Sequence, residues 1–435
     1  MIEFPFLSEY DPETKSEGSL DPLGTYSIAD KLATVLVPGF RERMRRPRFL
    51  TAMAVGTVVC NQFDEELIAA DDIIPPWQVY EWYVVQALVK TFRGKPDIIG
   101  LPGSDKASNA MNHDLKLNAS RYLKSPSVFG FHGVYRTLAR ALDVTYNDQL
   151  GEHGDRLVRA WEKDQKLAGF LSPEGEEGKS FKSLLYYAVK EGIDIGEVKR
   201  SWGWNFFNTI AEHLVPSKIG NQEGKVLFDL IVSDHKGFRG IVILKLMEFL
   251  KSDSYHGNFG ESAFYHDLFK DSSGDIKPLL KSILAYETFS RIITNAFEEI
   301  LFHMSDFKKQ TDISEMSELR SIRYATKNIA NQYKLTIDSF SETKGKIAFQ
   351  QTFDIFEQVR SASDFVELLI QHHRNIQKNK PPNGKMDWLV QTNMGKWIIS
   401  PNYVRKKSLV MPDDSFVHYY RTSSLLTFLK DLKKI

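Results

Sequence analysis

The sequence has a single cysteine, Cys60, among its 435 residues. One cysteine excludes an internal disulfide and any zinc site built on cysteine pairs, and it is typical of a reducing cytoplasm. No apolar stretch approaches the roughly 20 residues that a membrane-spanning helix needs. The first residues, "MIEFPFLSEYDPE", lack the basic start and small-residue cleavage site of a signal peptide. We therefore expect a cytoplasmic protein that does not contact a membrane.

The chain also lacks a net charge, because 56 lysines and arginines balance 56 aspartates and glutamates. Any affinity for nucleic acid must then come from local patches of charge. The hydrophobic content of 42% and the aromatic content of 12% are those of a folded globular protein. A chain of this length is too long for one small core, so several domains are expected.

Apolar residues recur at helical spacing along most of the chain, which predicts a mainly α, multi-domain fold. Near the C-terminus, "DWLVQTNMGKWIIS" contains two short runs around a turn and predicts a small β-hairpin. The polar stretch "SPEGEEGKS" predicts a linker at 172–180. The expected parts are an N-terminal helical domain with an arginine-rich loop (1–125), a helix-turn-helix or winged-helix-like unit (126–171), a helical middle domain (181–345) and a C-terminal α+β basic domain (346–435).

The first candidate site is the stretch "VPGFRERMRRPRFLT" at 37–51, where only Glu42 opposes a cluster of arginines. The cluster consists of Arg41, Arg43, Arg45, Arg46 and Arg48. Arginine presents a planar fork of donors that matches phosphate oxygens, and the helix that Pro47 opens adds a favourable dipole. The cluster therefore suggests phosphate contact. The alternative is a solvated loop, or arginines that pair with acids elsewhere in the fold.

The second candidate site lies in the 126–171 unit, where a turn joins two amphipathic helices. Basic residues lie on the faces away from the expected core, namely Arg136, Arg140, Arg156, Arg159 and Lys163. If the unit binds DNA, these side chains would contact the backbone. The alternatives are an ordinary helical hairpin and a winged helix that binds only protein.

The third candidate site extends from the end of a helix through the predicted hairpin. Its basic residues are His373, Arg374, Lys378, Lys380, Lys385, Lys396, Arg405, Lys406 and Lys407. A basic stretch beside an exposed aromatic residue, here Trp388, is typical of a nucleic-acid groove. The adjacent His372 and His373 point about 100° apart on a helix, so they do not form a metal site by themselves. The alternative is a solvated helix end.

The sequence contains no complete catalytic motif, and we expect no cofactor and no metal. Asp97, Asp114 and Lys116 follow a loose nuclease-like order, but "NAMNHDLKLN" resembles a turn more than the strand that such a site needs. Glu287, Arg291 and Glu298 share a helix, and the spacing predicts ion pairs within that helix. The sequence therefore favours a protein that is not an enzyme.

Two segments carry a family resemblance. "LDPLGTYSIADKLATVLVPGFRERMRRPRFL" (20–50) resembles the N-terminal signature of uncharacterised bacterial proteins encoded near helicases and other phage-defence genes. "KSPSVFGFHGVYRTLARAL" (124–142) is similar to a downstream segment of the same proteins, although "RERMRR" replaces a more neutral run. The resemblance implies a bacterial protein of antiviral defence that acts beside partner proteins, and it transfers no catalytic residue.

Together these observations favour a non-catalytic, DNA-associated subunit of a bacterial antiviral defence complex. Its basic patches would bind the nucleic-acid backbone, and its helical surfaces would bind partner proteins such as a helicase or nuclease. The alternatives are a protein-binding scaffold without nucleic-acid contact and a metal-dependent nuclease whose site the sequence does not reveal.

Overall fold

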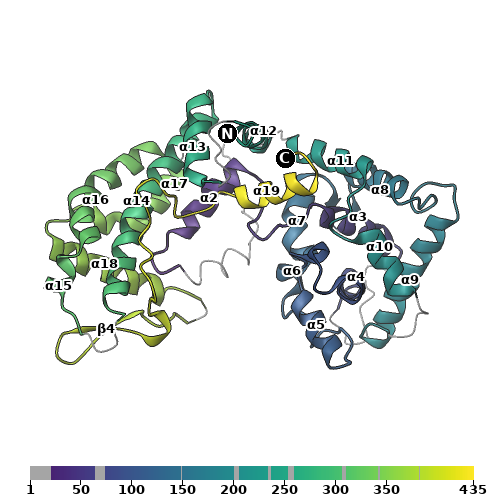
Figure 1. The fold of residues 1–435 in the computed structure, drawn as a ribbon, viewed down its shortest axis with the longest axis horizontal. Helices are drawn as coiled ribbons and strands as arrows, with labels where there is room; N and C mark the ends of the chain where they lie inside the picture. Colours follow the sequence, from purple (N-terminus) through teal and green to yellow (C-terminus); the bar gives the residue numbers. More distant parts are fainter. Residues whose placement is uncertain are drawn as a thin grey trace, which may run out of the picture. The chain divides into compact units, whose positions relative to one another are not determined.

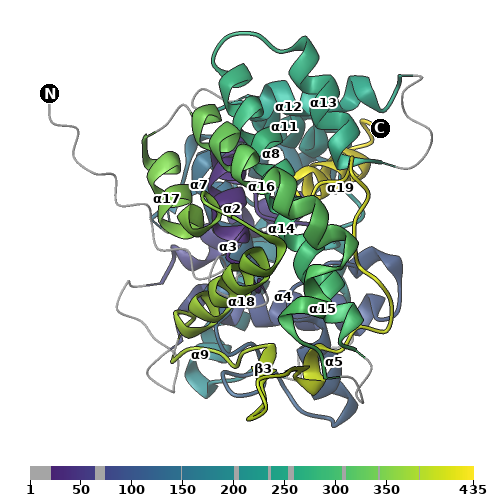
Figure 2. The ribbon, with the colours of Figure 1, turned by 90° about the vertical axis from the view of Figure 1, so that its left-hand side faces the viewer.

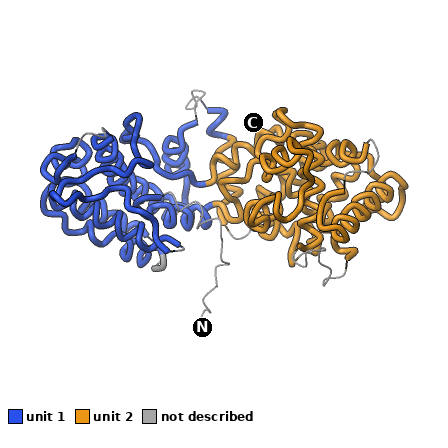
Figure 3. The backbone as a smooth tube through the Cα atoms, turned by 90° about the horizontal axis from the view of Figure 1, so that it is seen from below, with its two compact units in different colours: residues 1–36, 248–420 blue, residues 37–247, 421–435 orange. Residues whose placement is uncertain are grey.

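The protein is described here by a computed structural model. The described residues are 21–63, 74–147, 149–199, 205–233, 237–252, 259–305, 310–340, 343–381 and 383–435. They form two compact units (Figure 3): the described residues within 1–36 and 248–420 make up unit 1, and those within 37–247 and 421–435 make up unit 2. Helices dominate both units, which confirms the predicted mainly α fold. The expected middle domain, 181–345, is divided between the two units, and the stretch 172–180 lies inside unit 2.

Unit 2 is built around two helices whose side chains are buried on nearly all sides; Figure 1 labels both. The first, α3 (Arg48–Cys60), follows Pro47, from which its start was predicted, and the second, α4 (Pro76–Phe92), has Pro76 in its first turn. The other elements are η2 (Pro96–Ile98), α5 (Ser104–Asn112), α6 (Pro126–Phe129), α7 (Phe131–Ala141), β1 (Thr145–Tyr146), β2 (Gln149–Leu150), α8 (Glu152–Asp164), α9 (Glu177–Ile195), α10 (Phe206–Leu214), α11 (Asn221–Val232), α12 (Arg239–Phe249) and α19 (Thr422–Asp431). The last residues of α12 belong to unit 1.

The 126–171 segment is part of the core of unit 2. It contains two helices, α7 and α8, joined by the antiparallel pair β1–β2. Helix α7 packs on α3, and α8 packs on both α3 and α11. A winged helix is not confirmed, because the apolar faces of α7 and α8 are buried against the rest of unit 2 and not against each other in a separate module.

Unit 1 is arranged around the long helix α14 (Ile276–His303), against which α16 (Arg320–Ser339) packs (Figure 2). The remaining elements are α2 (Tyr26–Leu36), α13 (Glu261–Asp271), α15 (Ile313–Ser317), α17 (Thr343–Phe353), η3 (Asp354–Phe356), α18 (Ala362–Lys378), β3 (Leu389–Gln391), β4 (Trp397–Ile399) and η4 (Pro401–Tyr403). Strands β3 and β4 pair antiparallel with Val390 opposite Ile398, which confirms the predicted hairpin.

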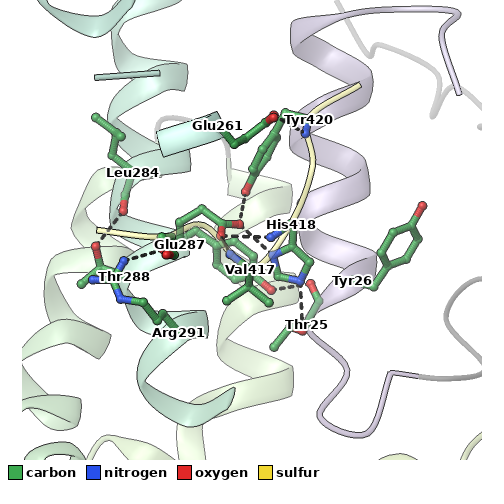
Figure 4. A network of polar contacts seen from close by, with 12 residues as sticks. Thr25, Tyr26, Glu261, Leu284, Glu287, Thr288, Arg291, Val417, His418 and Tyr420 are labelled. Atoms are coloured by element: carbon green, nitrogen blue, oxygen red, sulfur yellow. Dashed lines mark hydrogen bonds and ion pairs between the residues drawn. The ribbon is translucent and has the colours of Figure 1, made fainter. Parts of the chain in front are cut away.

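A polar stripe on α14 binds the segment that follows the hairpin, which we call the strap (residues 404–420). Glu298 pairs with Arg405, Asn295 exchanges two hydrogen bonds with the backbone of Met411, and Arg291 donates to the carbonyl of Ser415. Glu287 binds the end of the strap (Figure 4). The expected ion pairs within α14 are therefore wrong for these residues, since their partners come from the strap.

Candidate nucleic-acid interface

Arg48 is the most deeply buried member of the arginine cluster. Its side chain is 1% exposed and its Nε lies 3.1 Å from Oε1 of Glu223, which is completely buried. Its Nη1 donates to the carbonyl of Val215 at 2.6 Å. Burial raises the pKa of the Glu223 carboxyl, while the charge of Arg48 and the hydroxyl of Thr51 lower it. Because protein encloses the guanidinium, Arg48 is a structural ion pair, and we remove it from the candidate phosphate contacts.

Arg45 and Arg46 hold the C-terminal helix α19 in unit 2. Arg46 pairs with Asp431 at 2.6 Å and also donates to the carbonyls of Pro96 and Ile99. Arg45 donates to the hydroxyl of Ser423 at 2.7 Å. The backbone amides of both arginines donate to the hydroxyl of Tyr135. These contacts correspond to the alternative of arginines bonded within the fold.

The remaining arginines of the cluster are half-buried. The guanidinium of Arg43 lies 4.9 Å from the centre of the Phe129 ring. The carbonyl of Arg41 accepts a hydrogen bond from Ser424, again on α19. The arginine cluster is therefore largely packed within unit 2 and does not form an open cationic surface.

The basic residues of α7 and α8 divide into two groups. Arg136 and Arg140 on α7 are half-buried. On α8, Arg156 pairs with Asp229 at 3.1 Å and Arg159 pairs with Asp155 at 2.7 Å. Lys163 is exposed. The two exposed arginines each face a carboxylate, so the net positive charge of this surface is small.

Several basic residues of the third candidate site have partners within unit 1. Arg405 pairs with Glu298 through two hydrogen bonds, and Lys396 lies 2.8 Å from Asp312. Lys380 is 9% exposed and donates to the carbonyl of Asp21. Burial lowers the pKa of Lys380. Lys380 and Arg405 are therefore mainly structural, while Lys396 remains about 40% exposed.

His373 and Trp388 are buried, in contrast to the expected exposed basic and aromatic surface. Nδ1 of His373 donates to the carbonyl of Pro22 at 2.9 Å, and its Nε2 accepts from the amide of Trp388 at 3.0 Å. These two bonds require the neutral ring. Trp388 is 7% exposed and stacks on Tyr403 at 4.2 Å. The prediction of Trp388 as an exposed stacking platform is wrong, because its ring completes the core beneath the hairpin.

The buried histidine makes unit 1 sensitive to acid. Burial lowers the pKa of His373 to about 4. Between pH 6.5 and pH 4 the unfolded chain therefore binds a proton that the folded chain excludes, so stability falls as the pH falls through this window. Wild type should lose about 2 kcal/mol more than His373→Gln between pH 7.5 and pH 5.0. Urea unfolding at the two pH values measures this, and equal losses in both proteins would contradict it.

Four lysines of the third candidate site are exposed and lie outside the ion pairs. They are Lys378, Lys385, Lys406 and Lys407. Along the described ranges, no carboxylate oxygen lies within 4 Å of their ammonium groups. Arg374, at 43% exposure, pairs loosely with Asp387 at 3.3 Å and lies over the ring of Trp397. We call these five cations the basic surface of unit 1.

Part of the basic surface lines an open polar groove. The groove has a volume of about 570 Å³ and is formed by the end of α18 and the loop that leads to β3. Arg374, Lys378 and Lys385 line it together with the amides of Asn375 and Asn383, and Asp387 is the one acidic residue of its described lining. A shallow groove with several cations and amide donors can hold a chain of phosphate groups.

The nuclease-like residues do not come together as a metal site. Asp97 accepts a hydrogen bond from Ser217, and Lys116 pairs with Glu197. Among the described residues, no group of three or more histidines, cysteines, aspartates or glutamates has the arrangement to hold a metal ion. The geometry therefore adds no support for a metal-dependent nuclease.

The residues that sequence reasoning missed are the partners of the strap. Glu287 accepts from Nδ1 of His418 and from the hydroxyl of Tyr420, each at 2.7 Å, and Nε2 of His418 lies 3.1 Å from Oγ1 of Thr25 (Figure 4). The spacing of Glu287, Arg291, Asn295 and Glu298 was a usable signal, because such a polar stripe on an otherwise buried helix requires partners.

Comparisons with protein-family models, with curated proteins and with solved structures each found no match. Across the described part of the chain, no helix combines the length and the apolar character needed to cross a membrane.

Proposed function

We propose that this protein binds the backbone of a nucleic acid, most favourably DNA, through the basic surface of unit 1. The observation that carries the proposal is that four exposed lysines lack a carboxylate within 4 Å along the described ranges, and that two of them, Lys378 and Lys385, line the groove with Arg374. Such cations bind phosphates by releasing condensed counterions, without reading sequence. The proposed role is non-catalytic.

The burial of the aromatic rings supports backbone contact over base stacking. Trp388 and Trp397 are less than 10% exposed, and Tyr403 is half-buried under Trp388. Binding of single strands usually relies on exposed rings on which bases stack. We therefore expect duplex DNA to bind at least as well as a single strand of equal length.

The resemblance of 20–50 and 124–142 to proteins encoded in phage-defence loci is the reason to propose the biological setting. In that setting the protein would be a subunit of a bacterial antiviral complex, with a helicase or nuclease as a partner.

The test is a salt titration of binding to a short labelled DNA duplex. Five phosphate contacts predict a slope of about −4.5 in a plot of log affinity against log salt, or about a 500-fold loss between 50 and 200 mM salt. Lys406→Ala/Lys407→Ala should reduce the magnitude of the slope by about 2. The matched control is Lys327→Ala/Lys334→Ala, which removes two exposed lysines of α16. Equal slopes in both double variants, or no binding at low salt, would contradict the proposal.

A scaffold that binds an acidic protein is the second candidate function. The observation in its favour is the exposed apolar face of the hairpin, where Val390 and Ile398 lie opposite each other at 40% and 37% exposure. Met386 and Met394 nearby are 66% and 77% exposed. An apolar patch beside lysines suits an acidic partner segment. The scaffold would be favoured if the wild-type protein does not bind DNA and if Val390→Ser/Ile398→Ser no longer binds an acidic protein partner that the wild type binds.

A further inference from the structure

Unit 2 contains a pocket that plays no part in the proposed nucleic-acid interface. Its volume is about 470 Å³, which falls in the range of small-molecule sites. The pocket lies between α3, α4, the start of α7 and the β1–β2 pair. Residues from each of these elements line it, among them Thr57, Trp77, Phe131 and Gln149.

Two buried aromatic rings give the pocket a fixed floor. Tyr80 is 2% exposed and its hydroxyl donates to the carbonyl of Ala52 at 3.0 Å. A Cβ at Gly56 would lie 2.5 Å from the Tyr80 ring, so the ring can pack this close to α3 only because residue 56 is glycine. Phe131 is 1% exposed and stacks on Phe49. Since both rings are held from behind, the apolar floor exists before any ligand binds.

Two half-buried aromatic pairs form the sides of the pocket. Trp77 and His132 stack with ring centres 4.3 Å apart and an interplanar angle of 19°. Phe63 stacks on Tyr186 at 4.7 Å. The backbone amide of His132 donates to the buried carboxylate of Glu81, which anchors the start of α7 and therefore the position of the imidazole. The sides thus present flat aromatic surfaces that are still partly open to solvent.

The described polar residues that line the pocket carry neutral side chains. The side-chain amide of Asn61 donates to that of Gln149 at 3.0 Å, and Asn147 is a third amide in the lining. Each amide carries both donors and an acceptor, the combination that pairs with the edge of a nucleobase. Among the described residues that line the pocket, none is Asp, Glu, Lys or Arg. A charged ligand would therefore lose hydration without gaining an opposite charge.

We infer that this pocket binds an uncharged nucleobase, stacked on the aromatic surfaces and held at its edge by Asn61 and Gln149. The base could come from a free nucleoside or from a nucleic-acid strand, and the chemistry of recognition is the same for both. Aromatic rings bind the faces of bases in single-stranded nucleic-acid sites, and amide side chains bind their edges. The inference does not depend on the basic surface, because its residues all belong to unit 2.

The first experiment is calorimetric titration of the full-length protein with adenosine, guanosine, cytidine and thymidine. At least one nucleoside should bind with a Kd on the order of 10⁻⁴ M, the affinity expected for a ligand of that size. Trp77→Ala and Gln149→Leu should each weaken binding by about ten-fold or more. The matched controls are Tyr324→Ala and Gln62→Leu, which change exposed side chains outside the pocket and should leave the affinity unchanged.

Three results would overturn the inference. They are absence of binding for all four nucleosides at millimolar concentration, equal affinity in the pocket variants and the controls, and tighter binding of the corresponding monophosphate. Competition with a short single strand and with the same strand made abasic distinguishes the two sources. Displacement of the nucleoside only by the strand that carries bases identifies a strand base as a ligand, while absence of displacement identifies the free nucleoside; either result supports the nucleobase site.

Discussion

Replacing Arg48 by alanine is expected to lower the free energy of unfolding of unit 2 by about 3–5 kcal/mol. The variant would leave the carboxylate of Glu223 buried without its counter-charge. That carboxylate is 0% exposed and would keep only neutral partners, among them the hydroxyl of Thr51 at 2.7 Å. Hydrogen exchange of the α3 and α11 amides, read with urea unfolding, measures the loss in unit 2.

The matched control is Arg45→Ala, since Arg45 belongs to the same loop but is exposed. It donates to Ser423 on the surface, so its loss should cost about 1 kcal/mol or less. A loss in Arg48→Ala no larger than in Arg45→Ala would show that the ion pair is not required. Converting both members of the pair, as Arg48→Met/Glu223→Met, should cost less than the sum of the single changes, because no charge is left buried.

The pH dependence of Arg48→Ala gives an independent check. Burial already raises the pKa of Glu223, and removal of the arginine raises that pKa further. When the pKa of a group is higher in the folded state than in the unfolded state, the protein loses stability as the pH rises through the folded-state pKa. The free energy of unfolding of Arg48→Ala should therefore lie further below that of wild type at pH 8 than at pH 5. A deficit that grows as the pH falls would contradict the assignment.

Replacing Glu287 by leucine is expected to destabilise unit 1 by about 4 kcal/mol. The carboxylate is completely buried and accepts from Nδ1 of His418, the hydroxyl of Tyr420 and the amides of Val417 and His418 (Figure 4). Leucine would leave four donors without an acceptor in the interior. Each buried donor that loses its partner costs about 1–3 kcal/mol of stability. Local relaxation makes the total loss for the four donors smaller than the sum of these costs.

The loss should be concentrated in the strap and not spread over the whole chain. Amide exchange by mass spectrometry is expected to show faster exchange at 415–420 in Glu287→Leu. Glu287→Gln keeps one acceptor oxygen and should fall between the leucine variant and wild type. The matched control, Glu367→Leu, changes an exposed glutamate of α18 and should leave the strap unchanged. Unchanged exchange at 415–420 in Glu287→Leu would contradict the role assigned to this carboxylate.

The sequence by itself determined the elements whose causes are local. Pro47 predicted the start of α3, and the two runs around "TNMG" predicted the β3–β4 hairpin. These signals depend on residues within one or two turns of each other, because helix and hairpin patterns are set by near neighbours along the chain. Apolar periodicity also predicted the mainly α class.

Only the tertiary structure decided what the charged residues do. Arg48 and Arg46 belong to one arginine cluster, yet Arg48 pairs with Glu223 and Arg46 with Asp431, at separations of 175 and 385 residues. His373 and Trp388 suggested an exposed surface, and long-range packing buries both. Charge in a sequence reports how many cations are near one another, whereas burial and pairing depend on which distant carboxylates and carbonyls the fold brings within about 3 Å. For that reason the arginines that stood out most in the sequence are largely structural, and the less conspicuous lysines of the hairpin region form the exposed basic surface.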